Sequence, residues 1–157
     1  MSNDDAQRLI GLESSTAPRD RVLGSLASVL TLDAAALVLR VAFGVTLALA
    51  HGLNKLRTPE IFLSHVEKGG FPAPTLLGWF AILSEFVGGL LLALGLFTRP
   101  AAALVSSTLF VAAFKVHAND PFAKKELALA YAVVGLAFLI GGAGRYALDA
   151  VVKRKKH

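Results

Sequence analysis

Four long apolar segments dominate the pattern of hydrophobic and polar positions along the chain. They cover about 34–54, 75–97, 100–117 and a last stretch from Asp120-Pro121 to the GGAG at 141–144. A helix needs roughly 17–25 mainly apolar residues to cross the hydrocarbon core of a bilayer, so the pattern predicts four membrane-spanning helices. The loop between the second and third segments is very short, so these two helices should form an antiparallel hairpin.

Local signals predict where the first helix begins and place two shorter helices beside the spans. Thr31 or Asp33 can cap the first long segment. The apolar stretch 22–30 has only nine residues, so we expect an interfacial helix there rather than a span. Thr-Pro-Glu at 58–60 resembles a helix start and Gly69-Gly70 resembles a stop, which predicts a short surface helix in the first loop.

Composition supports a membrane protein. Of the 157 residues, 55% are hydrophobic and 17% are charged, and the mean hydropathy is +0.62, more apolar than a soluble domain of this size needs. The length allows one domain. The chain has no cysteine, which excludes disulfides and thiolate chemistry, including that of a membrane dithiol–disulfide carrier. We predict no metal site.

The formal net charge of +5 does not indicate nucleic-acid binding. Four of the 16 basic residues lie in the final KRKKH, directly after a hydrophobic segment, and such a cluster is typical of a cytoplasmic membrane flank. The first 20 residues carry early acidic groups and lack an apolar stretch followed by a cleavage site, so they do not resemble a signal peptide. The lipid bilayer is therefore the expected partner.

Basic residues outside the spans indicate the orientation. Four spans place both termini on one side, with nine basic residues: Arg8, Arg19, Arg21, Arg99, Arg145, Lys153, Arg154, Lys155 and Lys156. The other side holds six: Lys55, Arg57, Lys68, Lys115, Lys124 and Lys125. The excess favours cytoplasmic termini. We predict an all-α integral membrane four-helix bundle over 34–150, between a cytoplasmic or interfacial tail at 1–33 and a basic cytoplasmic tail at 151–157.

Strongly polar residues inside the spans fall on two helical stripes. At about 100° per residue, Arg40, His51 and Lys55 share one face of the first helix. Glu85 lies in the second helix among small residues, next to Gly88-Gly89. Intramembrane charges usually face the bundle interior, and small residues let helices approach closely. We therefore expect the two stripes to pack against each other.

Depth in the membrane suggests which polar groups meet. Measured from the cytoplasmic ends, Arg40 should lie about 9 Å deep, Glu85 about 18 Å and His51 about 25 Å. This order predicts an Arg40–Glu85 ion pair. His117 of the third helix should lie at a depth similar to that of His51, and Lys55 lies further out.

Each of these features also has a purely structural explanation. An Arg40–Glu85 pair can fix helix register, since buried ion pairs need not add stability. His51 and His117 can be interface histidines bonded to backbone or water, and Lys55 can be a solvated flank. Two histidines at one depth would also suit a b-type heme, which we do not favour because interface histidines are common and the bundle is small.

Five motifs, in their order and spacing, resemble the DoxX family of small bacterial four-helix membrane proteins. They are LRVAFG, HGLNKL, GGFPAP, SEFVGGLLLALGLFTRPAA and GAGRYALDA, and the resemblance covers about 37–150. Matching recurrent family positions are Arg40, His51-Gly52, Lys55, Glu85, Gly88-Gly89, Gly95, Thr98-Arg99 and Gly144-Arg145-Tyr146. Family members usually show GPGRYSLD near the end, where this chain has Ala143 for the proline and Ala147 for the serine.

The resemblance implies a bacterial cytoplasmic-membrane protein linked to redox metabolism. The family is named after a subunit associated with a quinone-reducing, thiosulfate-oxidising enzyme, and other members accompany detoxifying or oxidative-stress enzymes. We therefore predict a membrane subunit of a quinone-linked redox system, with a polar intramembrane pocket around Arg40, His51, Lys55, Glu85 and His117. His51 or Lys55 would hydrogen-bond a quinone carbonyl, Glu85 would relay its proton, and a soluble or membrane redox partner would supply electrons.

Two other functions are compatible with the sequence. One is a non-catalytic membrane anchor or scaffold that recruits a soluble redox or detoxifying enzyme through its basic tail. The other is a proton-coupled exporter of small molecules, which we rank last because small four-helix transporters carry their membrane carboxylate in the first helix rather than the second. Whether the chain is itself catalytic, which substrate it uses and its oligomeric state stay open.

Overall fold

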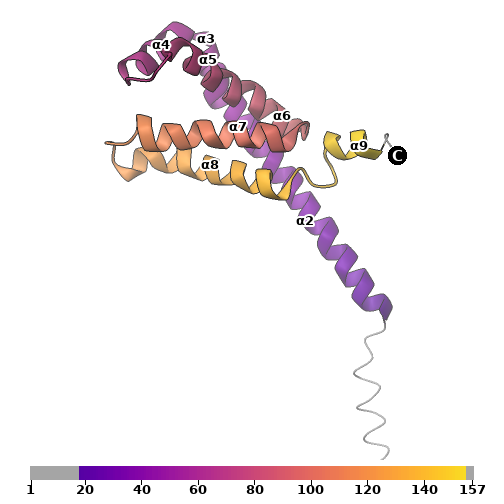
Figure 1. Ribbon diagram of the computed structural model, residues 1–157. Coiled ribbons are helices and arrows are strands. Elements are labelled where there is room, and N and C mark those ends of the chain that lie inside the picture. The colour runs from indigo at the N-terminus through magenta and orange to yellow at the C-terminus, as the bar shows by residue number, and fades with distance from the viewer. Residues whose placement is uncertain (1–17, 155–157) are drawn as a thin grey trace, which may run out of the picture. The chain divides into compact units, whose positions relative to one another are not determined.

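Helices form all the regular structure in the residues that the computed structural model describes, 18–154 (Figure 1). The predicted all-helical class is thus confirmed. In chain order the helices are α2 (Pro18–Thr46), η1 (Leu47–Gly52), α3 (Leu53–Arg57), α4 (Pro59–Lys68), α5 (Pro74–Leu83), η2 (Ser84–Gly88), α6 (Gly89–Leu94), α7 (Thr98–Val111), η3 (Ala112–Val116), α8 (Phe122–Gly141) and α9 (Leu148–Arg154), where η marks a π-helical turn. The chain divides into a unit that ends at Ala35 and a unit that begins at Ala36, and the packing and sites below belong to the second unit.

Within the described residues, three continuous helical stretches are long and apolar enough to cross a membrane. They are the first span, Ala27–Arg57, the second span, Pro74–Leu94, and the third span, Thr98–Val116. Helix α8 has 20 residues, but three charged residues, Lys124, Lys125 and Glu126, lie in its first turns and shorten its apolar part. By length and composition, the chain is a membrane protein with three or four helices able to span the bilayer.

The first helix begins earlier than the sequence predicts. Helix α2 includes the stretch 22–30, so the separate interfacial helix and the caps at Thr31 or Asp33 are wrong. Thr31 instead donates from Oγ1 to Ala27 O at 2.8 Å, the bond to residue i−4 that threonine makes inside helices. The short surface helix of the first loop is confirmed as α4, with a proline in its first position.

The second helix ends three residues short of its predicted end, at a glycine. Gly95 has a φ of +69°, where side chains other than glycine are strained. Its N–H donates to Leu92 O and the Leu96 N–H donates to Leu91 O, each at 3.0 Å. This pair of bonds is the Schellman arrangement, which satisfies the last carbonyls of a helix and turns the chain.

The first and second spans approach closely along the predicted small-residue face. A Cβ placed on Gly44 would overlap Gly89 O, and one placed on Gly52 would lie 2.5 Å from Phe86 Cα. Leu47 lies between these two contacts and is fully buried. The structure therefore confirms that the first and second spans pack together. In this packing, Gly52 lies against the backbone of Phe86, the residue after Glu85.

Two further glycines of the second span face other helices than expected. A Cβ on Gly78 would overlap Leu63 of α4, and one on Gly88 would lie 2.9 Å from Val105 of α7. Helices α7 and α8 run side by side (Figure 1). The apolar core lies among the spans and α8: Phe43, Leu47, Leu92, Ala101, Ala102, Val105, Leu109, Ala132 and Phe138.

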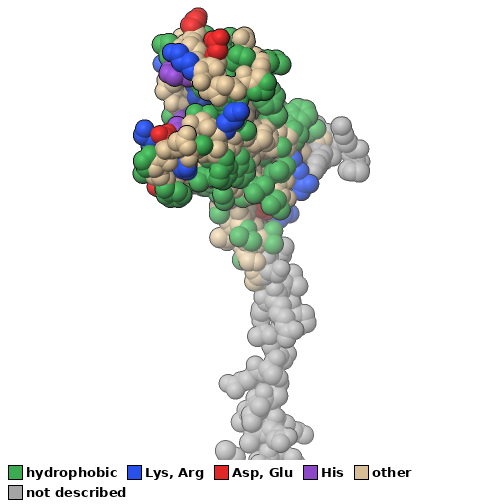
Figure 2. All heavy atoms as spheres, turned by 60° about the vertical axis from the view of Figure 1, so that its left-hand side comes forward, with side chains coloured by type: hydrophobic (Ala, Val, Ile, Leu, Met, Phe, Trp, Pro, Cys, Tyr) green, Lys and Arg blue, Asp and Glu red, His purple; other side chains and the backbone are tan. Residues whose placement is uncertain are grey.

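Large hydrophobic side chains also cover much of the outer surface. Figure 2 shows them over a broad area, with charged and histidine side chains gathered towards the ends of the molecule. Strongly exposed examples are Leu76, Leu94, Phe114, Val133 and Ile140. A soluble protein rarely exposes so much continuous apolar surface, whereas a bilayer would cover it.

Candidate functional site

A partly buried ion pair joins the first and second spans. Lys55 Nζ of α3 lies 2.5 Å from Glu85 Oε1 of η2 and donates to it. The Glu85 side chain is 2% exposed and that of Lys55 is 26% exposed. Glu85 Oε2 is buried and has no hydrogen-bond partner within the described chain. Such an oxygen can accept a further hydrogen bond or a proton.

The predicted Arg40–Glu85 pair is wrong, and the direction of helical side chains explains the error. Every Cα–Cβ bond in an α-helix tilts towards the N-terminus. The first span runs from Arg40 to Lys55, so Arg40 extends away from Glu85 whereas Lys55 extends back towards it. The contact of Gly52 with Phe86 also sets Glu85 at the Lys55 end of the span.

Arg40 belongs to a second polar cluster, which we call the Arg40 centre: Arg40, Gly95, Ala143, Tyr146 and Asp149. The Arg40 side chain is 1% exposed. It donates from Nη1 to Ala143 O at 3.3 Å and from Nη2 to Tyr146 O at 3.1 Å. Asp149 adds an electrostatic attraction. The guanidinium thus binds the chain segment that follows α8.

Asp149 connects the Arg40 centre to the turn between the second and third spans. Its carboxylate accepts the N–H groups of Phe97 and Thr98, each at 2.9 Å, and its own N–H donates to Gly95 O at 2.9 Å. A carboxylate at this position caps α7 and complements the helix dipole. Helix α7 therefore begins at Thr98, two residues before the predicted Pro100.

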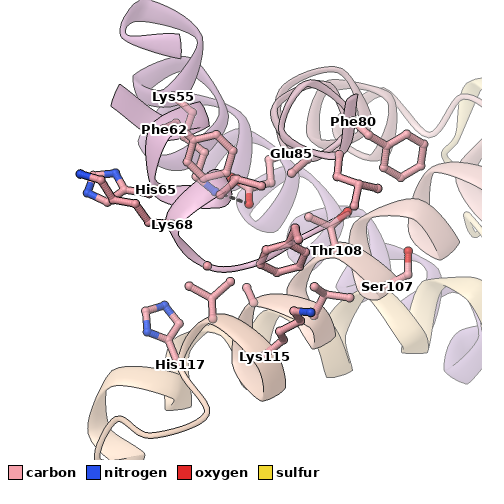
Figure 3. A pocket seen from close by; sticks show the side chains of 18 of the residues that line it. Lys55, Phe62, His65, Lys68, Phe80, Glu85, Ser107, Thr108, Lys115 and His117 are labelled. Carbon is pink, nitrogen blue, oxygen red and sulfur yellow. Dashed lines mark hydrogen bonds and ion pairs between the residues drawn. The ribbon is translucent and has the colours of Figure 1, made fainter. Parts of the chain in front are cut away.

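A cavity of about 820 Å³ opens beside the Lys55–Glu85 pair, and we call it the large cavity (Figure 3). It lies between α4 with its following loop, the second span and the third span. Figure 3 shows Lys55 and Glu85 on one side and Lys115 and His117 on the other. The lining residues are Lys55, Phe62, His65, Val66, Lys68, Gly69, Phe71, Pro72, Leu77, Phe80, Ala81, Glu85, Ser107, Thr108, Val111, Ala112, Lys115, Val116 and His117.

The large cavity combines an apolar body with a few charged groups. Two of its cations lie over aromatic rings: Lys55 Nζ is 4.7 Å from the Phe62 ring centre, and Lys115 Nζ is 4.4 Å from that of Phe71. These contacts hold the lysines against the cavity wall. A volume of several hundred Å³, with aromatic walls and few polar groups, is typical of a site for a small organic ligand.

A second cavity, of about 150 Å³, also adjoins the ion pair, and we call it the small cavity. Its lining residues are His51, Lys55, Glu85, Leu109, Ala112, His117, Lys124, Leu127, Ala128 and Tyr131. Lys55, Glu85, Ala112 and His117 line both cavities, so the two cavities are neighbours. Arg40 lines neither, so the structure brings four of the five predicted pocket residues together and leaves Arg40 out.

The two histidines of the small cavity have different surroundings. His51 packs edge-on against the Tyr131 ring, with ring centres 5.7 Å apart. His117 lies 2.8 Å from Asp120 through its Nδ1 and Oδ2 atoms. The 150 Å³ between their helices is below the volume that ordinary small-ligand sites provide, so the arrangement does not favour a heme between them.

Several features of the site were not predicted from the sequence. The α4 side of the large cavity, with Phe62 and Phe71, depends on how the first loop folds back over the second span. The GGFPAP motif at 69–74 was the available signal, since its glycines and prolines direct that return. Three π-helical turns, η1, η2 and η3, lie beside the cavities, and such turns are frequent at functional sites. In the part of the chain that the structure describes, no three histidines or carboxylates are placed to hold a metal.

The chain has a similar protein in Haemophilus influenzae, an uncharacterized protein that is 44% identical over 72 residues. The match covers 41% of this chain and 54% of the relative, so the chain spans about half of that protein's length. No solved structure matches. The sequence model of the DoxX family matches residues 35–118, which include the Lys55–Glu85 pair and most of both cavities. This chain therefore belongs to the DoxX family of proteins.

Proposed function

We propose that the protein binds a quinone in the large cavity and acts as the membrane subunit of a quinone-linked redox system. The observation that supports this most directly is the position of Glu85. Glu85 lines an apolar, aromatic cavity of about 820 Å³, with one carboxylate oxygen paired with Lys55 and the other buried without a partner among the described residues. Family membership supports the membrane setting.

The pair supplies the two polar contacts that a quinone and its reduced form need. Lys55 Nζ can donate a hydrogen bond to a carbonyl oxygen of the oxidised ring. Glu85 Oε2 can accept the hydroxyl hydrogen of the reduced ring and take up one of the two protons released on oxidation. The two electrons pass to or from a partner enzyme, because this chain has neither cysteine nor a dinucleotide-binding motif.

The membrane arrangement is part of the proposal. Helix α8 has 20 residues, which correspond to about 30 Å of helix, so it can serve as a fourth span with its lysines at the outer surface. Four spans and the excess of basic residues near the termini favour both termini in the cytoplasm of a bacterial cell. The Lys55–Glu85 pair then lies in the outer half of the membrane.

Impermeant thiol labelling tests this topology, because the chain has no native cysteine. In whole cells, Ser64→Cys in α4 should be labelled and Ser15→Cys should not. Labelling of Ser15→Cys alone would invert the protein and place the ion pair in the cytoplasmic half.

Thermal unfolding in detergent with a short-chain quinone tests the binding function. A ligand at 100 times its Kd stabilises a protein by about 2.7 kcal/mol, so the quinone should raise the Tm of the wild-type protein. Glu85→Gln and Lys55→Gln should lose most of this shift. Lys125→Gln is the matched control, because Lys125 bonds Ala118 O outside both cavities and its loss should not alter the shift.

A saturated alcohol with the same tail controls for partition into the micelle and should give no variant-dependent shift. Equal stabilisation of the wild-type protein and both pair variants would contradict quinone binding at this site. A protein that shows no shift with any quinone but captures a soluble oxidoreductase would instead be an anchor.

A further inference from the structure

The small cavity surrounds Glu85 with polar groups, three of which do not line the large cavity: His51, Lys124 and Tyr131. Its titratable lining residues are His51 from η1, Lys55 from α3, Glu85 from η2, His117 after η3, and Lys124 and Tyr131 from α8, while α7 contributes the apolar Leu109. A volume of 150 Å³ corresponds to about five water molecules at liquid density. The cavity therefore has polar groups that can bind a chain of waters and enough volume to hold one.

His117 is a partly exposed residue of this cavity. Its side chain is 35% exposed, so one part of the ring contacts solvent while the residue also lines the cavity. Its Nδ1 faces Asp120 Oδ2 at 2.8 Å, and Asp120 Oδ1 lies 3.6 Å from Lys124 Nζ. The hydrogen bond with His117 lowers the pKa of Asp120, so this carboxylate stays ionised at neutral pH.

An ionised Asp120 determines which ring nitrogen of His117 exchanges protons. The carboxylate can only accept, so it binds Nδ1–H and leaves Nε2 as the exchanging nitrogen. This combination of carboxylate, histidine and a polar cavity is suited to proton transfer.

We infer that the small cavity and His117 form a proton path between Glu85 and the outer surface, with Asp120 as the residue that positions His117. The inference rests on the proposed function, in which Glu85 takes a proton from a ligand in the large cavity. A ligand there would occupy that side of the ion pair. The proton would then leave through the small cavity, which shares Glu85, Lys55 and His117 with the large one.

The transfer balances in two steps. In the first, the Glu85 O–H bond breaks, waters of the small cavity pass the proton on, and an N–H bond forms at His117 Nε2. In the second, His117 releases a proton to solvent and returns to its neutral form, while its Nδ1–H stays bonded to Asp120. No electrons move, and Glu85 is again a carboxylate paired with Lys55.

Thiol accessibility tests whether the small cavity is hydrated, without any quinone. Leu109 and Val105 lie one turn apart on α7 and are 6% and 0% exposed, but only Leu109 lines the small cavity. A small charged methanethiosulfonate should label Leu109→Cys and leave Val105→Cys unlabelled. Equal protection of both variants would mean a dry cavity and would overturn the path.

Proton uptake by Glu85 after a rapid drop in pH tests the role of His117. The infrared band of the protonated carboxyl, identified by its absence in Glu85→Gln, would be followed in the ligand-free protein. His117→Ala should slow its appearance by about 10²-fold, the scale of a lost acid–base group, and added imidazole should restore the rate. Asp120→Asn should slow it less, and Lys125→Gln should not change it.

The outcomes separate this inference from the proposed function. A wild-type rate in His117→Ala would overturn the path even if a quinone binds. A slowed rate with imidazole rescue, in a protein that binds no quinone, would keep the path and reject the quinone. Loss of the band in a His117→Ala protein that melts normally, without imidazole rescue, would mean a structural role for His117 and would also overturn the path.

Discussion

Arg40 and Glu85 are both almost fully buried charged residues of the membrane region, yet their surroundings differ. Each keeps one polar atom, Arg40 Nε or Glu85 Oε2, without a hydrogen-bond partner among the described residues, so burial and satisfaction do not distinguish them. Arg40 binds backbone carbonyls and lines no cavity. Glu85 binds a partly exposed lysine and lines two cavities.

The partners explain what each residue can do. Backbone carbonyls neither titrate nor leave their helices and turns, so the Arg40 centre holds the first span, the Gly95 turn and the segment after α8 in one arrangement. Lys55 is a flexible side chain with access to solvent, so its contact with Glu85 can open for a ligand or a proton. In our proposal, the Arg40 centre stabilises the fold and the Lys55–Glu85 pair carries the chemistry.

The largest expected effect is the loss of stability on removing Arg40. Arg40→Leu would leave Ala143 O and Tyr146 O without their donor and Asp149 without its neighbouring positive charge. Hydrogen bonds to a charged group contribute about 1.5–3 kcal/mol each, so the loss of both should cost several kcal/mol. Thermal unfolding in detergent should show a large fall in Tm, while the fraction that stays folded should still bind quinone.

Arg99→Leu is the matched control for this change. Arg99 also donates to a helix-terminal carbonyl, Ile140 O at 3.2 Å, but this bond is exposed. Its removal should cost at most about 1 kcal/mol, as for other exposed polar contacts. Equal melting temperatures for the two variants would remove the distinction between the Arg40 centre and the Lys55–Glu85 pair.

Sequence patterns predicted the parts of the structure that depend on neighbouring residues. The proline and glycine signals around α4 act within a few residues, and the close packing of the first span on Gly89 followed from the small-residue stripe of the second helix. Asp149 was missed as the cap of α7 because it lies about 50 residues from Thr98, beyond the range in which capping patterns are read.

Depth in the membrane alone does not identify the partner of Glu85. Arg40 and Lys55 share one face of the first span, and only the contact register and the tilt of helical side chains select Lys55. The large cavity likewise depends on where α4 packs on the second span, which Leu63 and Gly78 determine together. Neither residue signals this contact by itself.

The next largest effect concerns the contact between the first and second spans at Gly44, which lies between Arg40 and Lys55 along the first span. In Gly44→Ala, the new Cβ would overlap Gly89 O, which is backbone and cannot move aside without shifting a helix. Overpacking of this kind typically costs about 1–3 kcal/mol. The change should lower the melting temperature and also weaken quinone binding, because the same contact sets Lys55 opposite Glu85.

Gly141→Ala serves as the control, because no atom of the described residues lies within 4 Å of the Cβ that it would add. It should leave both the melting temperature and quinone binding near wild type. If Gly44→Ala behaves in the same way, the first and second spans do not approach as closely as the structure shows.

A smaller effect distinguishes Lys55 from Arg40 as the partner of Glu85. Double-mutant cycles with leucine at Arg40, Lys55 and Glu85 measure the coupling between each pair. Contacting residues couple by at least about 0.5 kcal/mol, and the partial exposure of Lys55 keeps the expected value near 1 kcal/mol. Arg40 and Glu85 should be additive within about 0.3–0.5 kcal/mol. A larger coupling for Arg40 than for Lys55 would restore the pair that sequence alone suggested.

The smallest effect lies at the outer turn and depends on pH. The hydrogen bond with His117 lowers the pKa of Asp120, with a smaller contribution from Lys124, so the folded turn binds this proton less readily than the unfolded chain. The stability of the folded turn therefore rises with pH in the acid range. The stabilising contribution of Asp120 is complete above the usual aspartate pKa of about 4, and it is lost as the pH falls through the lowered pKa of Asp120 in the folded protein. Hydrogen exchange of the turn at 117–121 should show more opening of the wild-type protein in acid, whereas Asp120→Asn should open at all pH values and respond less to acid. If Asp120→Asn shows the same acid-induced opening as the wild-type protein, the opening does not arise from protonation of Asp120. Asp120 would then not position His117 in the proton path.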